Sequence, residues 1–321
     1  MIVKIIISGG FFMPTKEGTS QYFHEYFAEW IELYKKGAIR PVTYQKYLMT
    51  LRRLTELAPN LKFCELDKRS YQTLLNDYAE THEKQTTMDF HHHLKSAILD
   101  AVDEGLLTTD PTRKIIIKGK SATIRKNKFL SQFELQCLLK NLNLQNEINW
   151  DWFILLISKT GLRFSEALAL TPNDFDFSRQ RISITKTLNY KSVGGGFEET
   201  KNVSSKRTIQ IDPQLNAQLS TLFGGIAGDT LIFARSRVFN STVNNRLKVI
   251  CKTAEIPVIS LHSLRHTHAS LLIFAGVSVA SIARRLGHSS ITTTQETYLH
   301  IIRELENQDN DKIMRYLSTL T

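Results

Sequence analysis

The stretch LHSLRHTHASLL, residues 261–272, places three histidines and one arginine within an otherwise apolar run. His262 and Arg265 stand three residues apart, so on a helix both side chains project from one face. His266 comes one residue further round and is expected to point elsewhere, and His268 lies on another flank. Either these polar side chains are satisfied on the flank of a helix, or they converge on a negatively charged group.

The composition of the whole chain favours an anionic partner. Its 321 residues include 41 Lys and Arg against 31 Asp and Glu, a formal net charge of +10. An excess of that sign is typical of proteins that bind nucleic acid. The apolar fraction of 42% is ordinary for a globular protein, so large-scale disorder is not expected.

The cysteines and the first residues indicate the compartment. The spacing of the cysteines argues against a zinc cluster or a disulfide framework and fits a reducing compartment. They stand far apart at Cys64, Cys137 and Cys251. The opening MIVKIIISGG is too short to span a bilayer and is expected to form a short strand. We therefore predict a cytoplasmic protein without membrane contact.

The first third of the chain has the pattern of a small all-helical domain. Apolar and aromatic residues recur at helical spacing in SQYFHEYFAEWIELYKKG, a helix that is predicted to stop at Gly37. A second helix is expected to start at Thr43, after Pro41. DKRSYQTLLNDYAETH and MDFHHHLKSAILDAVDEGLL predict two more. The predicted organisation is a short segment over residues 1–18 and a four-helix domain over residues 19–107.

A basic segment over residues 108–128 is predicted to link two domains. Its only acid is Asp110. A solvated tether and a strand that crosses a nucleic-acid backbone both fit that charge. The candidate DNA-binding residues in it are Arg113, Lys114, Lys118, Lys120, Arg125, Lys126 and Lys128.

A second domain is predicted over residues 129–321. Ser131 and Glu134 form a capping-box pattern at its start. The pattern is first helical and then alternates in RISIT and RTIQI, which predicts two strands of a small antiparallel sheet on either side of a flexible turn at Gly194–Gly196. From Val238 onward it is helical again. The predicted fold class of this domain is mainly α (α+β).

Two further polar stretches stand out in the second domain. In TGLRFSEALAL, Arg163 precedes Glu166 by one helical turn, a spacing that surface ion pairs also show. In LGHSSITTTQETYLH, His288 follows the helix breaker Gly287, and Tyr298 lies ten residues on, where packing is the alternative role. Two arginines and two histidines around one phosphodiester would neutralise its oxygens, because a guanidinium stays charged and matches phosphate bidentately. A phenol becomes a nucleophile once its proton can leave.

Zinc is the alternative ligand for the histidines. His262, His266 and His268 are the candidates, but the sequence offers no HExxH spacing and no nearby Cys or acidic ligand. We therefore predict no metal site. Arg284 and Arg285 are expected on a solvated or phosphate-facing surface.

Five ordered motifs resemble those of the tyrosine recombinases: TGLRFSEALAL, TKNVSSKRTI, HSLRHTHASLL, LGHSS and TTTQETYLH. The chain is similar to phage- and transposon-type integrases over residues 19–321. This resemblance implies a SAM-like, four-helix core-DNA-binding domain followed by a catalytic domain with a C-terminal helix. It also implies a nucleoid-associated enzyme of bacterial or phage origin, double-stranded DNA with specific core sites as partner, a homotetramer on DNA, and DNA-bending accessory proteins.

The resemblance also implies roles for single residues. Arg163 and Arg265 match the two arginines that grip the scissile phosphate. His262 matches the histidine that assists proton transfer, and His288 matches a hydrogen-bond donor to the phosphate. Tyr298 matches the nucleophile.

Two further positions complete the implied site. Lys201 matches the lysine that protonates the leaving 5′ oxygen, although Lys191 and Lys206 lie in or near the same turn. Glu166 matches an acidic position that orients the first arginine or its neighbours. The implied reaction is strand exchange through a 3′-phosphotyrosyl intermediate and a Holliday junction. It needs neither ATP nor a metal, and the sequence has no Walker loop and no clustered carboxylates for two-metal chemistry.

Several alternatives stay open on the sequence alone. A type IB topoisomerase, a non-catalytic DNA-binding regulator and a metal-dependent hydrolase compete with the recombinase, which the small helical domain and short length favour over the topoisomerase. Residues 1–18 are too few for the arm-binding domain that many integrases carry, so we expect either recombination at simple core sites or a truncated or divergent integrase. The segment DKIMRYLSTL reads as a short amphipathic helix that packs on its own domain or on a neighbouring subunit.

Overall fold

The structure is a computed structural model in which the chain forms two compact units, with the division between Arg125 and Lys126. None of the described helices is long and apolar enough to cross a bilayer. The residues that the structure describes are 21–121, 129–190, 195–200, 203–234, 238–298, 314, 317 and 318.

Several sequence predictions fall outside the described residues. They concern the segment 1–18, most of the C-terminal helix, the first glycine of the predicted turn, and single lysines and arginines. Those basic residues are Arg125, Lys126, Lys128, Lys191 and Lys201.

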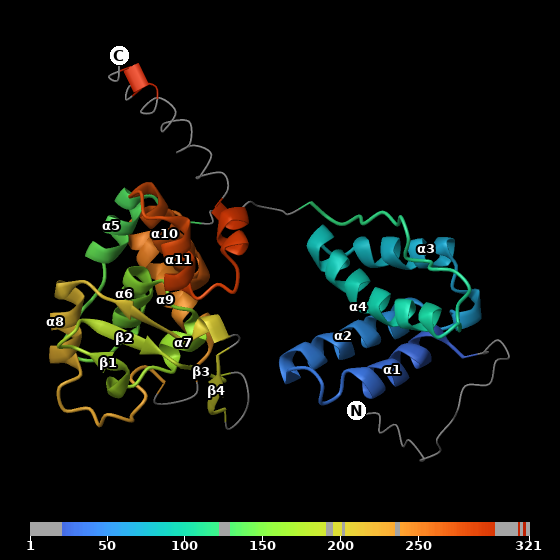
Figure 1. Ribbon diagram of the computed structural model, residues 1–321, viewed down its shortest axis with the longest axis horizontal. Helices are drawn as coiled ribbons and strands as arrows, with labels where there is room; N and C mark the ends of the chain where they lie inside the picture. Colours follow the sequence, from blue (N-terminus) through green and yellow to red (C-terminus); the bar gives the residue numbers. More distant parts are fainter. Residues whose placement is uncertain are drawn as a thin grey trace. The chain divides into compact units, whose positions relative to one another are not determined.

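The first unit contains the four predicted helices (Figure 1). α2 begins at Pro41 and not at Thr43, because a proline at the first helical position has a suitable φ and its missing N–H needs no partner there. A 3₁₀ turn at Phe63–Glu65 precedes α3. The helices are α1 (Phe23–Tyr34), α2 (Pro41–Leu57), α3 (Lys68–Ala79) and α4 (Lys84–Asp103).

The aromatic residues of α1 anchor this unit. Phe23 and Phe27 are fully buried in its apolar core, together with Leu94 of α4. The indole Nε1 of Trp30 donates to a carboxylate oxygen of Asp100 at 2.7 Å, so even the polar edge of the ring is paired with α4. The helical spacing of these residues thus corresponds to one buried face.

The first half of the predicted linker packs on this unit. The side chain of Gln72 in α3 accepts from the N–H of Ile116 and donates to its carbonyl oxygen, both at 2.8 Å. The N–H of Lys120 donates to the carbonyl oxygen of His82 at 2.8 Å. Residues 108–121 therefore belong to the first unit, which corrects the predicted boundary. Ile115 and Ile117, on either side of the exposed Ile116, pack against the core of this unit.

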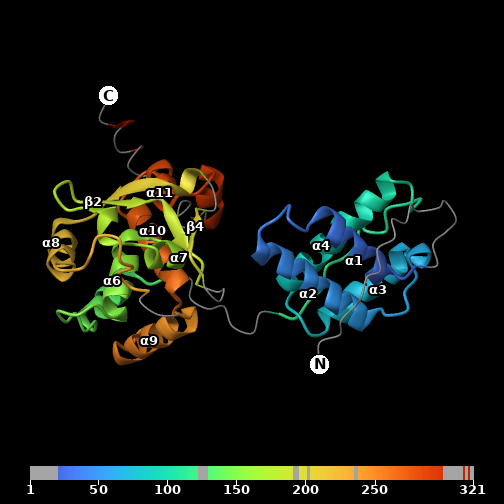
Figure 2. The same cartoon turned by 90° about the horizontal axis from the view of Figure 1, so that it is seen from below.

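The second unit is mainly helical and contains small antiparallel sheets, as predicted (Figures 1 and 2). Its helices are α5 (Gln132–Lys140), α6 (Trp150–Thr160), α7 (Phe164–Leu168), α8 (Pro213–Leu222), α9 (Asn240–Thr253), α10 (Leu261–Phe274) and α11 (Val279–Leu286), and residues 291–298 are also helical. Two 3₁₀ turns lie at Pro172–Asp174 and Val203–Ser205.

The two predicted strands are confirmed and pair with each other. β2 (Arg181–Ile184) and β5 (Arg207–Gln210) are antiparallel, with Ile182 opposite Ile209. β1 (Phe175–Asp176) joins the other edge of β2, and β3 (Lys186–Leu188) pairs with β4 (Phe197–Glu199) in a separate hairpin. These three strands were not predicted, because two or three residues are too few to show an alternation.

α6 forms the centre of the second unit. Its sequence WDWFILLISKT is apolar on every side, and nearly all of its residues are buried. α10 packs against it, and the sheet, α8 and α9 surround the pair (Figure 2). Gly161 ends α6 with a φ of 68°, a conformation that glycine adopts without strain. The chain therefore turns sharply and delivers Arg163 beside α10.

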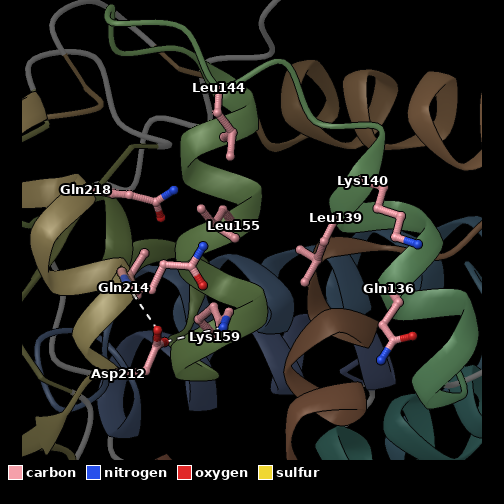
Figure 3. A pocket seen from close by; sticks show the side chains of 10 residues that line it. Gln136, Leu139, Lys140, Leu144, Leu155, Lys159, Asp212, Gln214 and Gln218 are labelled. Atoms are coloured by element: carbon pink, nitrogen blue, oxygen red, sulfur yellow. Dashed lines mark hydrogen bonds and ion pairs between the residues drawn. The ribbon is translucent and has the colours of Figure 1, made fainter.

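A hollow of about 290 Å³ lies among α5, α6 and α8 (Figure 3). Leucines and glutamines line most of it, and Lys159 forms an ion pair with Asp212 at 3.4 Å on one side. Asp212 also caps α8 by accepting from the N–H of Leu215. None of the predicted catalytic residues lines this hollow.

Candidate active site

The stretch 261–272 forms most of α10, which Ser260 caps by accepting from the N–H of Ser263. Thr267 accepts from the N–H of Leu130 at 2.9 Å and so fixes the start of the unit to this helix. The helix therefore has a defined position, and its polar side chains contact three other segments of the chain.

Arg265 is almost fully buried, with 4% of its surface exposed. Its two terminal nitrogens donate to the carbonyl oxygens of Gly161 and Leu286, each at 2.7 Å. These bonds use two of the five guanidinium N–H groups, and no other partner takes the rest within the described residues. Burial, and next the charge of Arg163, lowers the pKa of Arg265 to about 9, so it is still a cation at neutral pH.

Arg163 lies close to Arg265 and is held by a buried carboxylate. Its guanidinium donates to Glu166 at 2.7 Å and to the carbonyl oxygen of Gly287 at 2.9 Å. Glu166 is 1% exposed and also binds Arg207 through both of its oxygens, at 3.1 and 2.9 Å. Burial alone would raise the pKa of Glu166, but the hydrogen bonds and charge of Arg207 and the charge of Arg163 lower it to about 2. Glu166 is therefore an anion that holds two cations.

Arg207 is a site residue that the sequence reasoning missed. Its Nε donates to the carbonyl oxygen of Arg285 at 2.6 Å, and its side chain is 7% exposed. In the motif TKNVSSKRTI the resemblance assigns a role to the lysine only, and Arg207 stands at the start of a predicted strand. The sequence analysis paired Glu166 with Arg163 alone, and no local pattern indicated that this acid would bind a second arginine.

Tyr298 lies near Arg265. Its hydroxyl is 2.9 Å from Nδ1 of His266, and 2% of the residue is exposed. Burial raises the pKa of Tyr298 to about 12, although the charge of Arg265 acts in the opposite direction. The ring packs in an apolar cluster with Ala269, Ile273, Ile282 and Leu286.

The position of His266 corrects the sequence prediction that this side chain points away from the other site residues. His262 and His266 stand four residues apart and therefore share one face of α10. Their rings meet edge to face, with centroids 4.8 Å apart. Desolvation, and then the charges of Arg265 and Arg163, lowers the pKa of His262.

His288 also joins this group of residues. It follows Gly287, which ends α11 with a φ of 69°. Its Nδ1 is 2.7 Å from the hydroxyl of Thr294, which fixes the ring. Burial, followed by the charges of Arg265 and Arg163, lowers the pKa of His288 to about 4, so the imidazole is neutral at pH 7.

His268 and Arg285 have structural roles next to the site. Nε of Arg285 donates to Nε2 of His268 at 2.9 Å, and Nδ1 of His268 lies 3.1 Å from the carbonyl oxygen of Ser158. Burial lowers the pKa of His268 to about 3. Arg285 also donates to the carbonyl oxygens of Gln210 and Lys159. Arg284 is exposed as expected, whereas Arg285 is half-buried and reaches the surface only along a hollow that it lines together with Arg284 and His288.

The three histidines of the zinc alternative do not converge. His268 uses its ring nitrogens for Arg285 and Ser158, and His266 holds Tyr298. Across the described part of the chain, no group of three or more His, Cys, Asp or Glu side chains is arranged to hold a metal ion.

Five of the predicted catalytic positions and Glu166 thus meet in one chain, whereas Lys201 lies outside the described residues. Lys206, the neighbouring candidate, is exposed and lies 3.9 Å from Glu199. Of the predicted DNA contacts, Arg113, Lys114, Lys118 and Lys120 are described and belong to the first unit.

Comparisons with known proteins agree with the ordered motifs. The sequence model of the phage integrase family matches residues 128–304. An integrase of Staphylococcus phage L54a is 24% identical over 332 residues, which cover 91% of this chain and 92% of the relative. The ICEBs1 integrase of Bacillus subtilis (strain 168) is 30% identical over 238 residues, 68% of this chain and 62% of the relative.

Solved structures share the fold. The Tn1549 transposon integrase in complex with a circular intermediate DNA has a TM-score of 0.73 and 17% identity, and the match covers 90% of this chain and 99% of that chain. A lambda integrase dimer bound to a COC′ core site has a TM-score of 0.65 and 17% identity, over 85% of this chain and 76% of that chain. The chain belongs to the phage integrase family of tyrosine recombinases, enzymes that cleave and rejoin DNA.

Proposed function

We propose that this enzyme is a site-specific DNA recombinase in which Tyr298 attacks a DNA phosphodiester and forms a 3′-phosphotyrosyl bond. One observation carries the proposal: within a single chain, the buried Arg265 lies close enough to both Arg163 and Tyr298 to interact with their charges. The freed 5′ hydroxyl is then exchanged for that of a partner strand, through a Holliday junction.

The two arginines supply the charge that the transition state needs. Attack on phosphorus builds negative charge on the non-bridging oxygens, and cations that are already fixed in place stabilise it without reorganisation. Arg265 is fixed by two carbonyl oxygens, and Arg163 by Glu166 and Gly287. Each keeps N–H donors for a bidentate contact with phosphate.

The histidines are suited to hydrogen bonding at the phosphate. His288 is neutral at pH 7 and held by Thr294, so its ring is fixed as a donor or acceptor. His262 lies at the exposed edge of α10 and completes the histidine pair with His266. We assign protonation of the leaving 5′ oxygen to Lys201, on the strength of the motif alone.

The remaining DNA contacts are proposed for basic surfaces on both units. In the second unit a hollow of about 860 Å³ adjoins His288 and includes the exposed basic side chains of Arg181, Lys206 and Arg284. In the first unit, which we propose to be the core-DNA-binding domain, the basic residues from Arg113 onward supply backbone contacts. Assembly of a tetramer on paired core sites belongs to the same proposal.

A covalent-capture experiment tests the function. The protein is mixed with a DNA core site that carries a nick near the cleavage position, so that the short product diffuses away and the adduct persists. We expect a protein–DNA adduct in buffer that contains a chelator, and none with Tyr298→Phe. An adduct that forms equally well with that variant would refute the assignment of the nucleophile.

A second assay separates recombination from relaxation. Supercoiled plasmids with one site or with two sites are incubated with the enzyme. Recombinant products from the two-site plasmid support the proposal. Relaxation of both plasmids without exchange would identify a topoisomerase-like activity instead.

A further inference from the structure

The hydroxyl of Tyr298 is held by one particular histidine. His266 places Nδ1 at 2.9 Å from it, with the two ring centroids 5.8 Å apart. His262 lies one turn earlier on α10, and within the described residues it makes no hydrogen bond to the tyrosine. Its ring instead meets the ring of His266 edge to face, with the two centroids 4.8 Å apart. Of the two histidines on this face, His266 alone has the geometry to receive the phenolic proton.

We propose that His266 is a catalytic residue that accepts the proton of Tyr298 during DNA cleavage and returns it during rejoining. This inference rests on the proposed function. As the bond from the tyrosine oxygen to phosphorus forms, the phenolic proton moves to Nδ1 of His266. The bond from phosphorus to the 5′ oxygen breaks, and that oxygen leaves with the electron pair and takes a proton from the general acid. In rejoining, the imidazolium returns its proton to the tyrosine oxygen.

The need for an acceptor follows from the burial of the phenol. Tyr298 is 2% exposed in an apolar cluster, so solvent has little access to its hydroxyl. Burial raises the pKa of the phenol to about 12, well above neutral pH. A proton acceptor in direct contact with the attacking oxygen is the arrangement that general base catalysis requires, and heavy-atom distances of about 2.6–3.2 Å are typical.

The surroundings of His266 make the transfer depend on DNA. Among the described residues, its neighbours include His262 and Arg265 on its own helix, His288 after α11, and Tyr298 on the helix 291–298. Arg265 is a cation at neutral pH, and its charge opposes a second positive charge close by. A bound phosphate brings the compensating negative charge. His266 thereby becomes an effective base when the substrate is in place.

The test measures single-turnover cleavage of the nicked core site by His266→Asn and His266→Ala. The amide oxygen of asparagine lies near the place of Nδ1 and accepts a hydrogen bond, but it takes no proton at neutral pH. We expect both variants to cleave roughly 10²–10⁴-fold more slowly, the usual contribution of a general base. His92→Asn is the matched control, an exposed histidine of α4 in the first unit, and it should cleave at the wild-type rate.

Two readouts separate proton transfer from a structural role. The rate of the wild-type enzyme should rise with pH and level off once His266 is neutral, whereas the rate of His266→Asn should keep rising with pH because hydroxide replaces the base. A substrate whose bridging 5′ oxygen is replaced by sulfur has a leaving group that needs no acid. It should restore cleavage to Lys201→Ala and leave His266→Asn slow.

Each result decides between the two proposals. A wild-type rate and pH profile in His266→Asn would overturn the role of His266, as would rescue of that variant by the sulfur substrate. A wild-type protein that forms no Tyr298-dependent adduct would overturn the proposed function itself. Nicked-site binding, measured for each variant, confirms that it is folded. If His266→Ala does not bind, His266→Asn and His266→Gln decide the question.

Discussion

Two tyrosine–histidine pairs in this chain have the same contact and different surroundings. In the first unit the hydroxyl of Tyr71 lies 2.9 Å from Nδ1 of His91, as Tyr298 does from His266 in the second. Burial and Asp110 both raise the pKa of Tyr71, whereas Arg265 acts against the effect of burial on Tyr298. A histidine contact alone therefore does not make a phenol a nucleophile. A nearby cation is also needed, because it stabilises the phenolate and binds the phosphate.

Replacement of the two tyrosines gives the largest contrast. We expect Tyr298→Phe to abolish adduct formation and to leave DNA binding intact. Tyr71→Phe should keep the adduct and cost about 1–3 kcal/mol of stability, because Nδ1 of the buried His91 loses its partner. Adduct yield on denaturing gels and urea unfolding measure the two effects. Loss of the adduct in Tyr71→Phe, with DNA binding intact, would contradict the view that Tyr71 has only a structural role.

A second contrast compares two buried carboxylates of the second unit, both of which bind arginine. Glu166 binds Arg163 and Arg207 in the site, and Asp151 binds Arg246 with two bonds of 2.7 Å away from it. Glu166→Gln should cost about 3–5 kcal/mol of stability, because the buried Arg207 loses its anion. Asp151→Asn should cost less, because 39% of the Arg246 side chain is exposed and water solvates its charge.

The two variants should differ in activity. Only Glu166→Gln should slow cleavage, since it alone releases a catalytic arginine. Cleavage rates at a temperature at which both variants remain folded provide the measurement. Equal rates for the two variants would remove the positioning role of Glu166.

The acid response of the second unit should depend on Glu166. The folded state holds the pKa of this carboxyl at about 2, below its ordinary value of 4.5. Its contribution, about 3 kcal/mol from the size of that shift, is therefore complete above pH 4.5 and is lost as the pH falls toward 2. Urea unfolding of the wild type at a series of pH values should show this loss. Glu166→Gln should show a flatter profile, and an unchanged slope would contradict the assignment.

The smallest expected contrast concerns two glycines with positive φ. Gly37 follows α1 with open space around it, whereas a Cβ on Gly161 would lie 2.7 Å from the ring of His268. Gly37→Ala should cost about 1 kcal/mol through backbone strain alone. Gly161→Ala should cost about 1–3 kcal/mol more and disturb the carbonyl that holds Arg265. Thermal unfolding of the two variants compares them, and equal costs would mean that the crowding around Gly161 is relieved.

Much of the fold and of the site was predictable from local sequence. Helical spacing identified α1 to α4, and alternation identified β2 and β5. The predicted positions Arg163, Arg265 and Tyr298 come together in the structure. More than a hundred residues separate the first of them from the last along the chain. The sequence pattern marked them because polar groups in apolar runs need a partner.

The remaining features depend on tertiary contacts that no local pattern encodes. His266 was expected to point elsewhere because it was compared with Arg265 and not with His262, with which it shares a helix face. Arg285 was expected at the surface, but its partners come from α6, β5 and α10. Arg207 pairs with an acid 41 residues away in the sequence.

The most direct test is to identify the residue that carries the DNA. The captured adduct is digested with nuclease and protease, and tandem mass spectrometry locates the residual 3′-phosphonucleotide on the peptides. The account predicts a single modified residue, Tyr298. A nucleotide on any other residue, or an adduct whose DNA is attached through its 5′ phosphate, would contradict it.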